Sequence, residues 1–485
     1  KFYTVLAREV DFRGTDDADL AEITRGADGS LNVAIFPLSS SGNRTTPYLT
    51  RRFLPDETNE VRVFLNAGDD RAVIRGDAKS DIMLRIIGGD GDDVVLDSIP
   101  TGDRALRVYD AEGNDRLESS RHIAIDRKPY VPPSTGLVQH TVRDWGTWVY
   151  MQRSVTYAPT IGVLASISGT RFTYGFRKYP FASRSTLRLD VSPSERRPRL
   201  TYEGTFHQMN STQQLNLRLM ASGLELIRFH GFGNDTRNDS STTHYRVFQN
   251  LFRVEPMWVF KSTQQLTWSV GAVGQYTTTR DDARTLVGAT RPYGSGSFGE
   301  AGARMELEID RRDVPNAATK GFRLAARGTV YPAVWSVDRT FADADVVAST
   351  YVSAGGYLAP TLAVRAGGQH VWGTFPYHNA AFLGGSRSLR GWNEQRFAGR
   401  SSLFGSAELR VRLGRYSILV PADIGLIGFT DIGRVFVDSE SSDVWHSSVG
   451  GGISIAPIAR THTVTLSAAR SRERTGFYIR SGFAF

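Results

Sequence analysis

Most of the chain beyond residue 160 alternates apolar with polar or charged residues at a period of two. Leu187, Leu189 and Val191, for example, are separated by Arg188 and Asp190. Successive side chains of a β-strand point to opposite faces, so each such segment is predicted to be a strand with one apolar face and one polar face. About fifteen segments of roughly 10–15 residues follow this pattern. They begin near residues 161, 184, 198, 214, 245, 264, 297, 321, 346, 361, 403, 418, 446, 461 and 475.

The polar faces of these segments are rich in Arg and Glu, which favours apolar side chains that face lipid and charged side chains that line a lumen. A closed antiparallel barrel leaves no unpaired backbone in the hydrocarbon region of a membrane. Bacterial single-chain barrels have even strand numbers. We therefore predict an all-β fold with a 16-stranded antiparallel transmembrane β-barrel, whose remaining strand lies within residues 144–177. A large soluble all-β protein is the alternative.

The charge distribution divides the chain in two. Residues 1–140 hold 18 basic and 24 acidic residues, a net charge of −6, whereas the rest has a net charge of +14 and all eight tryptophans. Three prolines between Lys128 and Pro133 indicate a stiff linker. We expect an acidic, β-rich extramembrane domain over 1–128, a Pro-rich linker leading into the barrel over 129–159, and the barrel over 160–485.

The acidic region contains three short strands, each followed by a Gly-Asp-Asp or Gly-Asn-Asp turn. These turns, at 68–70, 91–93 and 113–115, are spaced by 23 and 22 residues. A period of this length predicts stacked β-solenoid coils or a small β-sandwich. Glycines and aspartates are densest at the middle turn.

Residues 88–96 match the calcium nonapeptide pattern Gly-Gly-x-Gly-x-Asp-x-apolar-x. Calcium prefers carboxylate and carbonyl oxygens, so Asp90, Asp92 and Asp93 are candidate Ca²⁺ ligands. Asp and Gly also form tight, solvated turns without any ion, which is the simpler interpretation. No other cofactor is expected.

A long segment separates the predicted strands at 361–372 and 403–413, and it contains Leu389-Arg390-Gly391-Trp392. An arginine inside a lumen is costly unless its guanidinium meets carboxylates in bidentate geometry. Glu408 lies on the charged, lumen-facing parity of the following strand. Gly391 allows close backbone approach, and we expect Trp392 to pack against the barrel wall. An ordinary surface loop with a surface ion pair is the alternative.

The order of several motifs resembles the Omp85 (BamA/TamA) superfamily over roughly residues 160–485. These motifs are the Leu-Arg-Gly-Trp segment, then Ser406-Ala407-Glu408-Leu409, then Phe429-Thr430-Asp431-Ile432-Gly433, with five strands after the loop and a final Phe. In that family a long loop folds back into the barrel, and acidic residues of the next two strands meet its arginine. The resemblance implies that Glu408 and Asp431 are the partners of Arg390, in a structural and not a catalytic role. Ile427 and Phe429 share the parity of Asp431, so the alternation assigns Asp431 to the lumen-facing side less clearly than it assigns Glu408.

The last segment also carries a signal. Phe477, Ile479, Phe483 and Phe485 alternate with other residues up to the end of the sequence. An amphipathic final strand that ends on an aromatic residue resembles the assembly signal of bacterial outer-membrane proteins.

Residues 175–181 and 229–236 resemble segments of Omp85 barrels that are fused to calcineurin-like metallophosphatases. The phosphatase motifs themselves are missing from the chain, so such a domain would lie upstream of Lys1. The sequence opens without an initiator Met or a signal peptide, and we expect a processed product. The helical pairs of POTRA domains, which usually precede Omp85 barrels, are not evident in residues 1–140, which weakens an insertase-type role.

No pattern of a hydrolase, P-loop or metalloprotease is present, so we expect a protein that is not an enzyme. The chain has no Cys, which excludes disulfides and thiolate sites.

The resemblance implies an outer-membrane barrel that acts in protein insertion or translocation, or in lipid homeostasis, through a lateral seam. It implies a periplasmic amino-terminal domain and contacts with outer-membrane lipids, the assembly machinery and other envelope proteins, but not with nucleic acid. A barrel that anchors or secretes a fused amino-terminal domain is the alternative, and a passive pore with a calcium-stabilised cap is a third interpretation.

Overall fold

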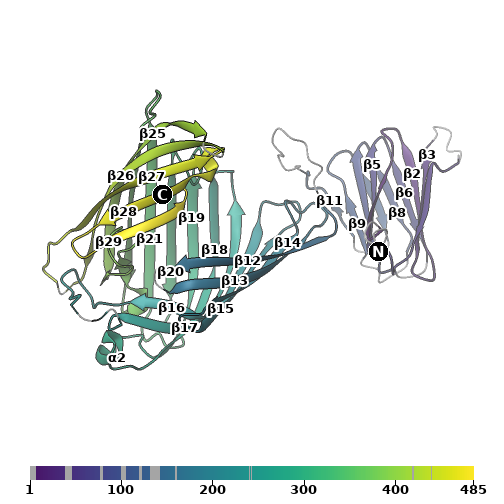
Figure 1. The fold of residues 1–485 in the computed structure, drawn as a ribbon. Coiled ribbons are helices and arrows are strands. Elements are labelled where there is room, and N and C mark those ends of the chain that lie inside the picture. Colours follow the sequence, from purple (N-terminus) through teal and green to yellow (C-terminus); the bar gives the residue numbers. More distant parts are fainter. Residues whose placement is uncertain are drawn as a thin grey trace. The chain divides into compact units, whose positions relative to one another are not determined.

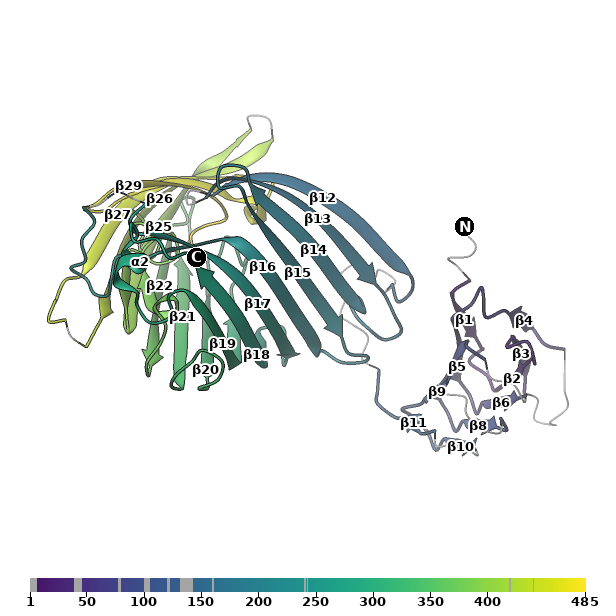
Figure 2. The same cartoon turned by 90° about the horizontal axis from the view of Figure 1, so that it is seen from below.

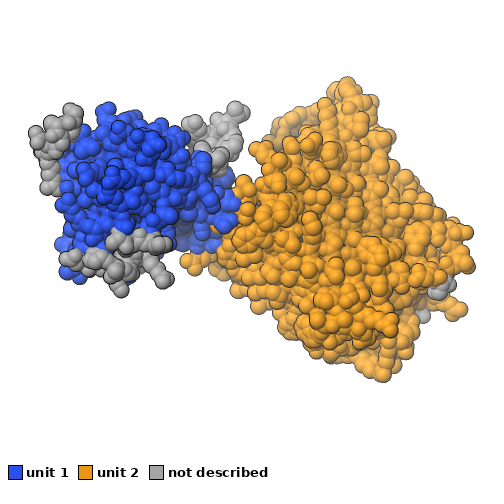
Figure 3. All heavy atoms as spheres, turned by 180° about the vertical axis from the view of Figure 1, so that it is seen from behind, with its two compact units in different colours: residues 1–148, 172–183, 208–211 blue, residues 149–171, 184–207, 212–485 orange. Residues whose placement is uncertain are grey.

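The computed structural model describes residues 7–38, 46–76, 80–99, 105–119, 123–130, 143–158, 161–239, 241, 243–417, 420–438 and 440–485. The chain forms two compact units, which Figure 3 distinguishes by colour. Unit 1 comprises residues 1–148, 172–183 and 208–211, and unit 2 comprises residues 149–171, 184–207 and 212–485. Part of the predicted linker, residues 131–142 and 159, lies outside the described residues, as does residue 160 of the predicted barrel. No helix in the described part of the chain is long and apolar enough to span a membrane.

Unit 1 consists of two β-sheets, with strand orders β1-β5-β7-β9-β11 and β10-β8-β6-β2-β3-β4. From β5 onward the chain alternates between the sheets, and each strand pairs in parallel with the strand two places later, as in a β-solenoid. The strands are β1 (Glu9–Arg13), β2 (Asp19–Arg25), β3 (Leu31–Pro37), β4 (Leu49–Phe53), β5 (Glu60–Ala67), β6 (Arg71–Arg75), β7 (Met83–Asp90), β8 (Val94–Asp97), β9 (Leu106–Tyr109), β10 (Arg116–Ser119) and β11 (Ile125–Asp126).

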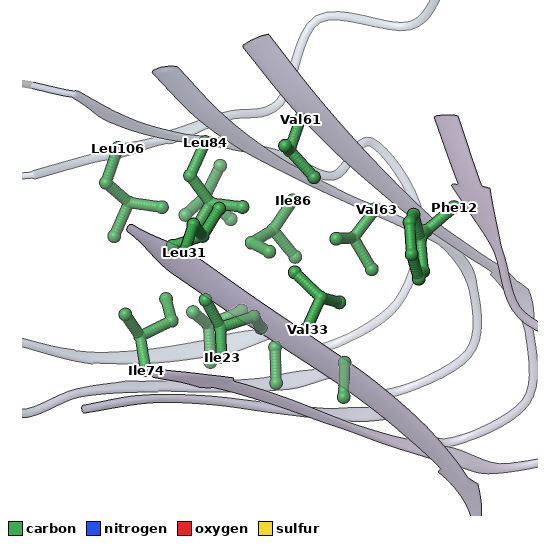
Figure 4. Packing of buried hydrophobic residues seen from close by; sticks show 14 of the residues in the cluster. Phe12, Ile23, Leu31, Val33, Val61, Val63, Ile74, Leu84, Ile86 and Leu106 are labelled. Atoms are coloured by element: carbon green, nitrogen blue, oxygen red, sulfur yellow. The ribbon is translucent and has the colours of Figure 1, made fainter. Parts of the chain in front are cut away.

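Alternating aliphatic residues of the two sheets meet in the core of unit 1 (Figure 4). Val61 and Val63 of β5 and Leu84 and Ile86 of β7 are fully buried there. The β5–β7 ladder places Val61 beside Leu84 and Val63 beside Ile86, so one coil repeats the packing of the last. The Gly-Asp turns therefore recur about once per coil, because each coil places the same aliphatic positions in the shared hydrophobic core.

Unit 2 is built on one antiparallel sheet of sixteen strands, which confirms the predicted strand number. Figures 1 and 2 show these strands following one another in chain order, from β12 in blue to β29 in yellow. The strand that the alternation did not locate is the first one. The strands are β12 (Thr147–Ala158), β13 (Gly162–Thr173), β14 (Ser183–Ser192), β15 (Arg197–His207), β16 (Gln214–Arg228), β17 (Arg246–Lys261), β18 (Leu266–Thr279), β19 (Ser297–Asp310), β20 (Gly321–Tyr331), β21 (Phe341–Ser353), β22 (Thr361–Trp372), β25 (Ser401–Ser417), β26 (Pro421–Phe436), β27 (His446–Pro457), β28 (Val464–Arg470) and β29 (Thr475–Ser481).

The strands of unit 2 have their apolar side chains on the outer face and their charged side chains on the inner face. In β25, Leu403 and Leu409 are 45% and 49% exposed, whereas Glu408 and Arg410 are buried. This inversion of the usual core is what the alternation of Leu with Arg and Glu predicts for a lipid-facing barrel.

The connection between β22 and β25 folds back against the inner face of this sheet. It contains a 3₁₀ turn, η1 (Tyr377–Asn379), and a two-stranded ribbon of β23 (Ala381–Leu383) and β24 (Phe397–Gly399). Two further short elements lie in other connections, α2 (Leu286–Thr290) and η2 (Arg460–His462). We call residues 384–396, between the two strands of the ribbon, the inner loop.

Candidate functional site

Arg390, in the middle of the inner loop, is buried between two carboxylates. Its Nε donates to Asp431 Oδ2 at 2.8 Å, its Nη2 donates to Asp431 Oδ1 at 2.7 Å, and its Nη1 donates to Glu408 Oε2 at 2.8 Å. The backbone N–H of Arg390 also donates to Asp431 Oδ2, at 3.0 Å. Asp431 thus receives both a bidentate guanidinium and a main-chain donor, the geometry in which charge-assisted bonds are strongest.

The irregular parity of β26 is explained by the same contact. Ile427, Phe429 and Asp431 all face the interior and are all buried. The guanidinium carbon of Arg390 lies 3.5 Å from the centroid of the Phe429 ring. An aromatic face beneath a cation is a favourable contact, so the apolar residues on the inner face of β26 form part of the seat for Arg390.

Gly391 brings the inner loop against the last two strands. Its backbone N–H donates to Tyr478 Oη of β29 at 2.7 Å, and Ser471 Oγ donates to its carbonyl oxygen at 2.9 Å. Its φ of +86° belongs to the left-handed region. A Cβ atom there would lie 3.1 Å from the carbonyl oxygen of Ala469. Both the conformation and the close approach therefore require glycine.

Trp392 completes the contact of the inner loop with β27. The indole Nε1 donates to the carbonyl oxygen of Ser447 at 3.1 Å. Its ring packs edge-on against Phe397 and His446, in a small apolar cluster that also holds Leu383. Arg390, Gly391 and Trp392 together contact strands β25, β26, β27 and β29.

A second layer of the network extends from Glu408. Its Oε1 accepts from Arg410 Nε at 2.7 Å, and Arg410 donates onward to the carbonyl oxygen of Ala318 at 2.9 Å. The guanidinium of Arg410 lies 4.0 Å from the centroid of the Phe483 ring. Glu408 is therefore shared by two arginines, one from the inner loop and one from its own strand.

Other anchors of the segment between β22 and β25 could not be recognised in the sequence. Asn379 of η1 donates to the buried Glu300 of β19 at 3.1 Å, and Gln275 of β18 donates to the same carboxylate. Arg396 is buried and donates to Glu473 and to the carbonyl oxygen of Thr236. Each of these pairs joins residues far apart in the chain, so no local pattern indicates them.

Thr236 belongs to the segment 229–236, which connects β16 to β17. Within it, Asn234 is buried and donates through Nδ2 to the carbonyl oxygen of Val435 at 2.8 Å and to Glu440 at 2.9 Å. Gly233 forms a bridge with Ala398 of β24. The segment therefore fastens the ribbon and the end of β26, which is a structural use of these residues.

The aromatic residues near the end of the sequence occupy two different environments. Phe477 and Ile479 of β29 are each 79% exposed, on the outer face. Strand β29 ends at Ser481, and Gly482 has a φ of +81°, which breaks the alternation. Phe483 and Phe485 are only partly exposed: Phe483 packs near Phe429, and Phe485 packs near Tyr351 and Ala363.

The candidate calcium ligands are also separated. Asp90 and Asp92 are exposed, whereas Asp93 is buried. In the part of the chain that the structure describes, Asp93 groups instead with Asp110 and Asp115. The nonapeptide pattern thus indicates the turn but contributes only one member of this group.

One known protein family matches this chain. Residues 177–485 match the model of the Omp85 superfamily domain. No curated protein matches the chain in sequence. Among solved structures, the chain is similar to BamA from Haemophilus ducreyi lacking POTRA domains 1–3, with 12% identity and a TM-score of 0.51 over 70% of this chain and 69% of that one. At this identity the likeness concerns the fold.

Two CdiB structures are more distant. CdiB from Escherichia coli has 12% identity and a TM-score of 0.44, over 70% of this chain and 63% of that one. CdiB from Acinetobacter baumannii has 10% identity and a TM-score of 0.40, over 70% of this chain and 60% of that one.

Proposed function

The chain belongs to the Omp85 superfamily of outer-membrane β-barrels, and from this premise we propose that it inserts or translocates proteins through a seam between β12 and β29. The observation that carries the proposal is the strand order of unit 2. Strands β12 and β29 stand at the two ends of the strand order and are not neighbours in it. An unpaired strand edge is a template on which another chain can add a strand.

The two seam strands also differ in length. β29 has seven residues and β12 has twelve, so even complete pairing would leave part of β12 without a partner. Val149 and Met151 of β12 are 60% and 67% exposed, and Gln152 and Arg153 are exposed as well. Apart from Ser154, residues 147–157 of β12 are exposed, which supports its role as the receiving edge.

In this proposal the inner loop makes one side of the seam rigid. Arg390 binds β25 and β26, Trp392 binds β27, and Gly391 binds Tyr478 of β29. The strands that follow the loop are thereby tied into one block. Opening of the seam would then move β12 and its neighbours more than β29.

The lengths of the connections support a periplasmic position for unit 1. Residues 1–146 precede β12, so they join the barrel at the end where β12 begins. The long connections 229–245, 280–296 and 373–400 all lie at the opposite end of an antiparallel sheet, whereas the short turn 262–265 lies at the same end. In outer-membrane barrels the short turns are periplasmic and the long loops extracellular. We expect the partners of the barrel to be outer-membrane lipids, unfolded envelope proteins and the assembly machinery.

Cysteine cross-linking tests the seam directly, because the natural chain has no Cys. One cysteine is placed in β12 and one in β29, and pairs are scanned along both strands. The protein is reconstituted in vesicles, and insertion of an unfolded outer-membrane substrate is measured with the pair oxidised and reduced. We expect oxidation to abolish insertion and reduction to restore it.

A matched control joins β28 to β29 at Ala468 and Phe477, which already face each other in the ladder. Oxidation of this pair should leave insertion unchanged. Equal insertion with an oxidised and a reduced seam pair would refute the proposal, and would favour a barrel that only anchors a fused domain.

A further inference from the structure

A row of carboxylates follows the stacked turns of unit 1. Asp70 Oδ1 accepts from the backbone N–H of Asp19 at 2.6 Å, and Asp93 Oδ1 accepts from the N–H of Asp70 at 2.9 Å. Asp115 Oδ1 continues the row by accepting from the N–H of Asp93 at 3.4 Å. Each coil thus presents one aspartate to the coil before it. These bonds use one oxygen of each carboxylate and leave the second oxygen for other partners.

The second oxygen of Asp93 faces the carboxyl group of Asp110 and has no donor from any other described residue. Asp93 is 2% exposed, and its Oδ2 is buried. It points to the same small space as Oδ2 of Asp110, which is 5% exposed. A Cβ atom on Gly88 would lie 2.3 Å from Asp93 Oδ2 and 1.8 Å from Asp110 Oδ2. The two oxygens therefore converge on a cradle that exists only because residue 88 is glycine.

The charges around this cradle do not balance. Asp93 and Asp110 face each other and also face the carboxylates of Asp70 and Asp115. Among the described residues, Arg127 is the cation bound to this group, and it pairs with Asp115 at 2.7 Å. Burial raises the pKa of both Asp93 and Asp110 above the ordinary range. Two buried carboxylates this close require either a shared proton or a cation.

We propose that Asp93, Asp110 and Asp115 bind a divalent, oxygen-preferring cation of the Ca²⁺ class over Gly88. One carboxylate oxygen from each residue lies within 4.8 Å of the other two. Ca²⁺ holds its ligands at about 2.3–2.6 Å, so two oxygens on opposite sides of one ion are about 5 Å apart at most. The observed spacing fits a single ion without rearrangement of the backbone.

The position of the cradle gives the ion a structural task. Asp93 precedes β8, Asp110 follows β9, and Asp115 precedes β10. One ion would therefore join two successive coils of unit 1. Asp90 and Asp92, the other acidic residues of the nonapeptide turn, are exposed and have no part in the site. The inference does not depend on the function proposed for the barrel.

Calorimetric titration of the full chain in detergent with CaCl₂ at pH 7.5 tests the site. We expect one saturable site in the natural chain, and at least a tenfold weaker affinity in Asp93→Asn and Asp110→Asn. Gly88→Ala keeps every carboxylate but fills the cradle, and it should also lose at least tenfold. The matched control, Asp92→Asn, should bind as the natural chain does.

Hydrogen exchange of β5 and β7 shows whether each variant still has a folded unit 1. Absence of saturable Ca²⁺ binding by the folded natural chain would overturn the proposal and assign the carboxylates a shared proton. An equal loss of affinity in Asp92→Asn and Asp110→Asn would overturn the assignment to this cradle. Should Gly88→Ala unfold unit 1, Asp93→Asn and Asp110→Asn still test the proposal against their control, Asp92→Asn.

Discussion

Replacement of Arg390 by Ala is the sharpest perturbation of the inner loop. Asp431 is completely buried and Glu408 is 2% exposed, and Arg390 reaches them through three side-chain bonds of 2.7–2.8 Å. Without the guanidinium, Glu408 keeps Arg410 as a partner at 2.7 Å, whereas Asp431 loses its bidentate cation. The cost of the substitution therefore falls mainly on Asp431.

Removing one partner of a buried ion pair typically costs about 3–5 kcal/mol, because a buried charge is left uncompensated. At about 1.4 kcal/mol per factor of ten, this lowers the folded-to-unfolded ratio by roughly two to three and a half orders of magnitude. The double variant Arg390→Ala, Asp431→Asn removes the unpaired charge as well. It should be more stable than the sum of the two single changes predicts, by about 0.5–3 kcal/mol.

Urea unfolding in lipid vesicles measures these free energies, and migration of unheated samples on gels gives an independent readout. Arg387→Ala is the matched control, because Arg387 lies on the same loop and is exposed. It should change stability by less than about 0.5 kcal/mol. If Arg390→Ala is no more destabilising than Arg387→Ala, or if the double variant is simply additive, the buried charge does not hold the loop.

Three further results are expected. In the absence of divalent cations, Asp70 and Asp110 should stabilise unit 1 at low pH and lose this contribution as the pH rises from about 4 through about 7, because burial raises the pKa of both carboxyls in the folded state to about 7. Urea unfolding at pH 5 and pH 8, followed by hydrogen exchange of β5, checks this. Gly391→Ala should lower the stability of the barrel by about 1–3 kcal/mol, since the backbone of Gly391 is left-handed. Unheated samples should then lose the folded migration on gels at a lower temperature than the natural chain does, and an unchanged migration would contradict this. Asn234→Ala should cost about 1–3 kcal/mol in urea unfolding, because buried backbone groups of β26 lose their partner, whereas the exposed Asn238→Ala should cost clearly less.

The alternation of the sequence predicted the barrel because each strand obeys one local rule. The exception, β12, has Trp148 and Tyr150 on one parity and Val149 and Met151 on the other, so both faces look apolar. At Asp431 the rule was obscured for the opposite reason. Phe429 faces inward because a cation lies on it, and a local pattern does not reveal a partner 39 residues away in the chain.

Contacts between distant segments set the limit of what the sequence could predict. Asn379 and Glu300, or Asn234 and Val435, belong to no shared motif, and only the tertiary fold of unit 2 brings them together. The same holds for the acidic turns of unit 1. The repeat located the coils, but which aspartates converge depends on how Asp93 of one coil stacks on Asp110 and Asp115 of the next.

The contacts of the inner loop also impose an order on assembly. The strands that Arg390 and Gly391 bind are all synthesised after the loop: Asp431 is 41 residues later in the chain than Arg390, and Tyr478 is 87 residues later than Gly391. Its binding surface is therefore incomplete until β29 has paired with β28. A misregistered carboxyl-terminal strand would leave Arg390 or Gly391 without its partner, so the full set of these contacts is compatible with one register of β26 and β29.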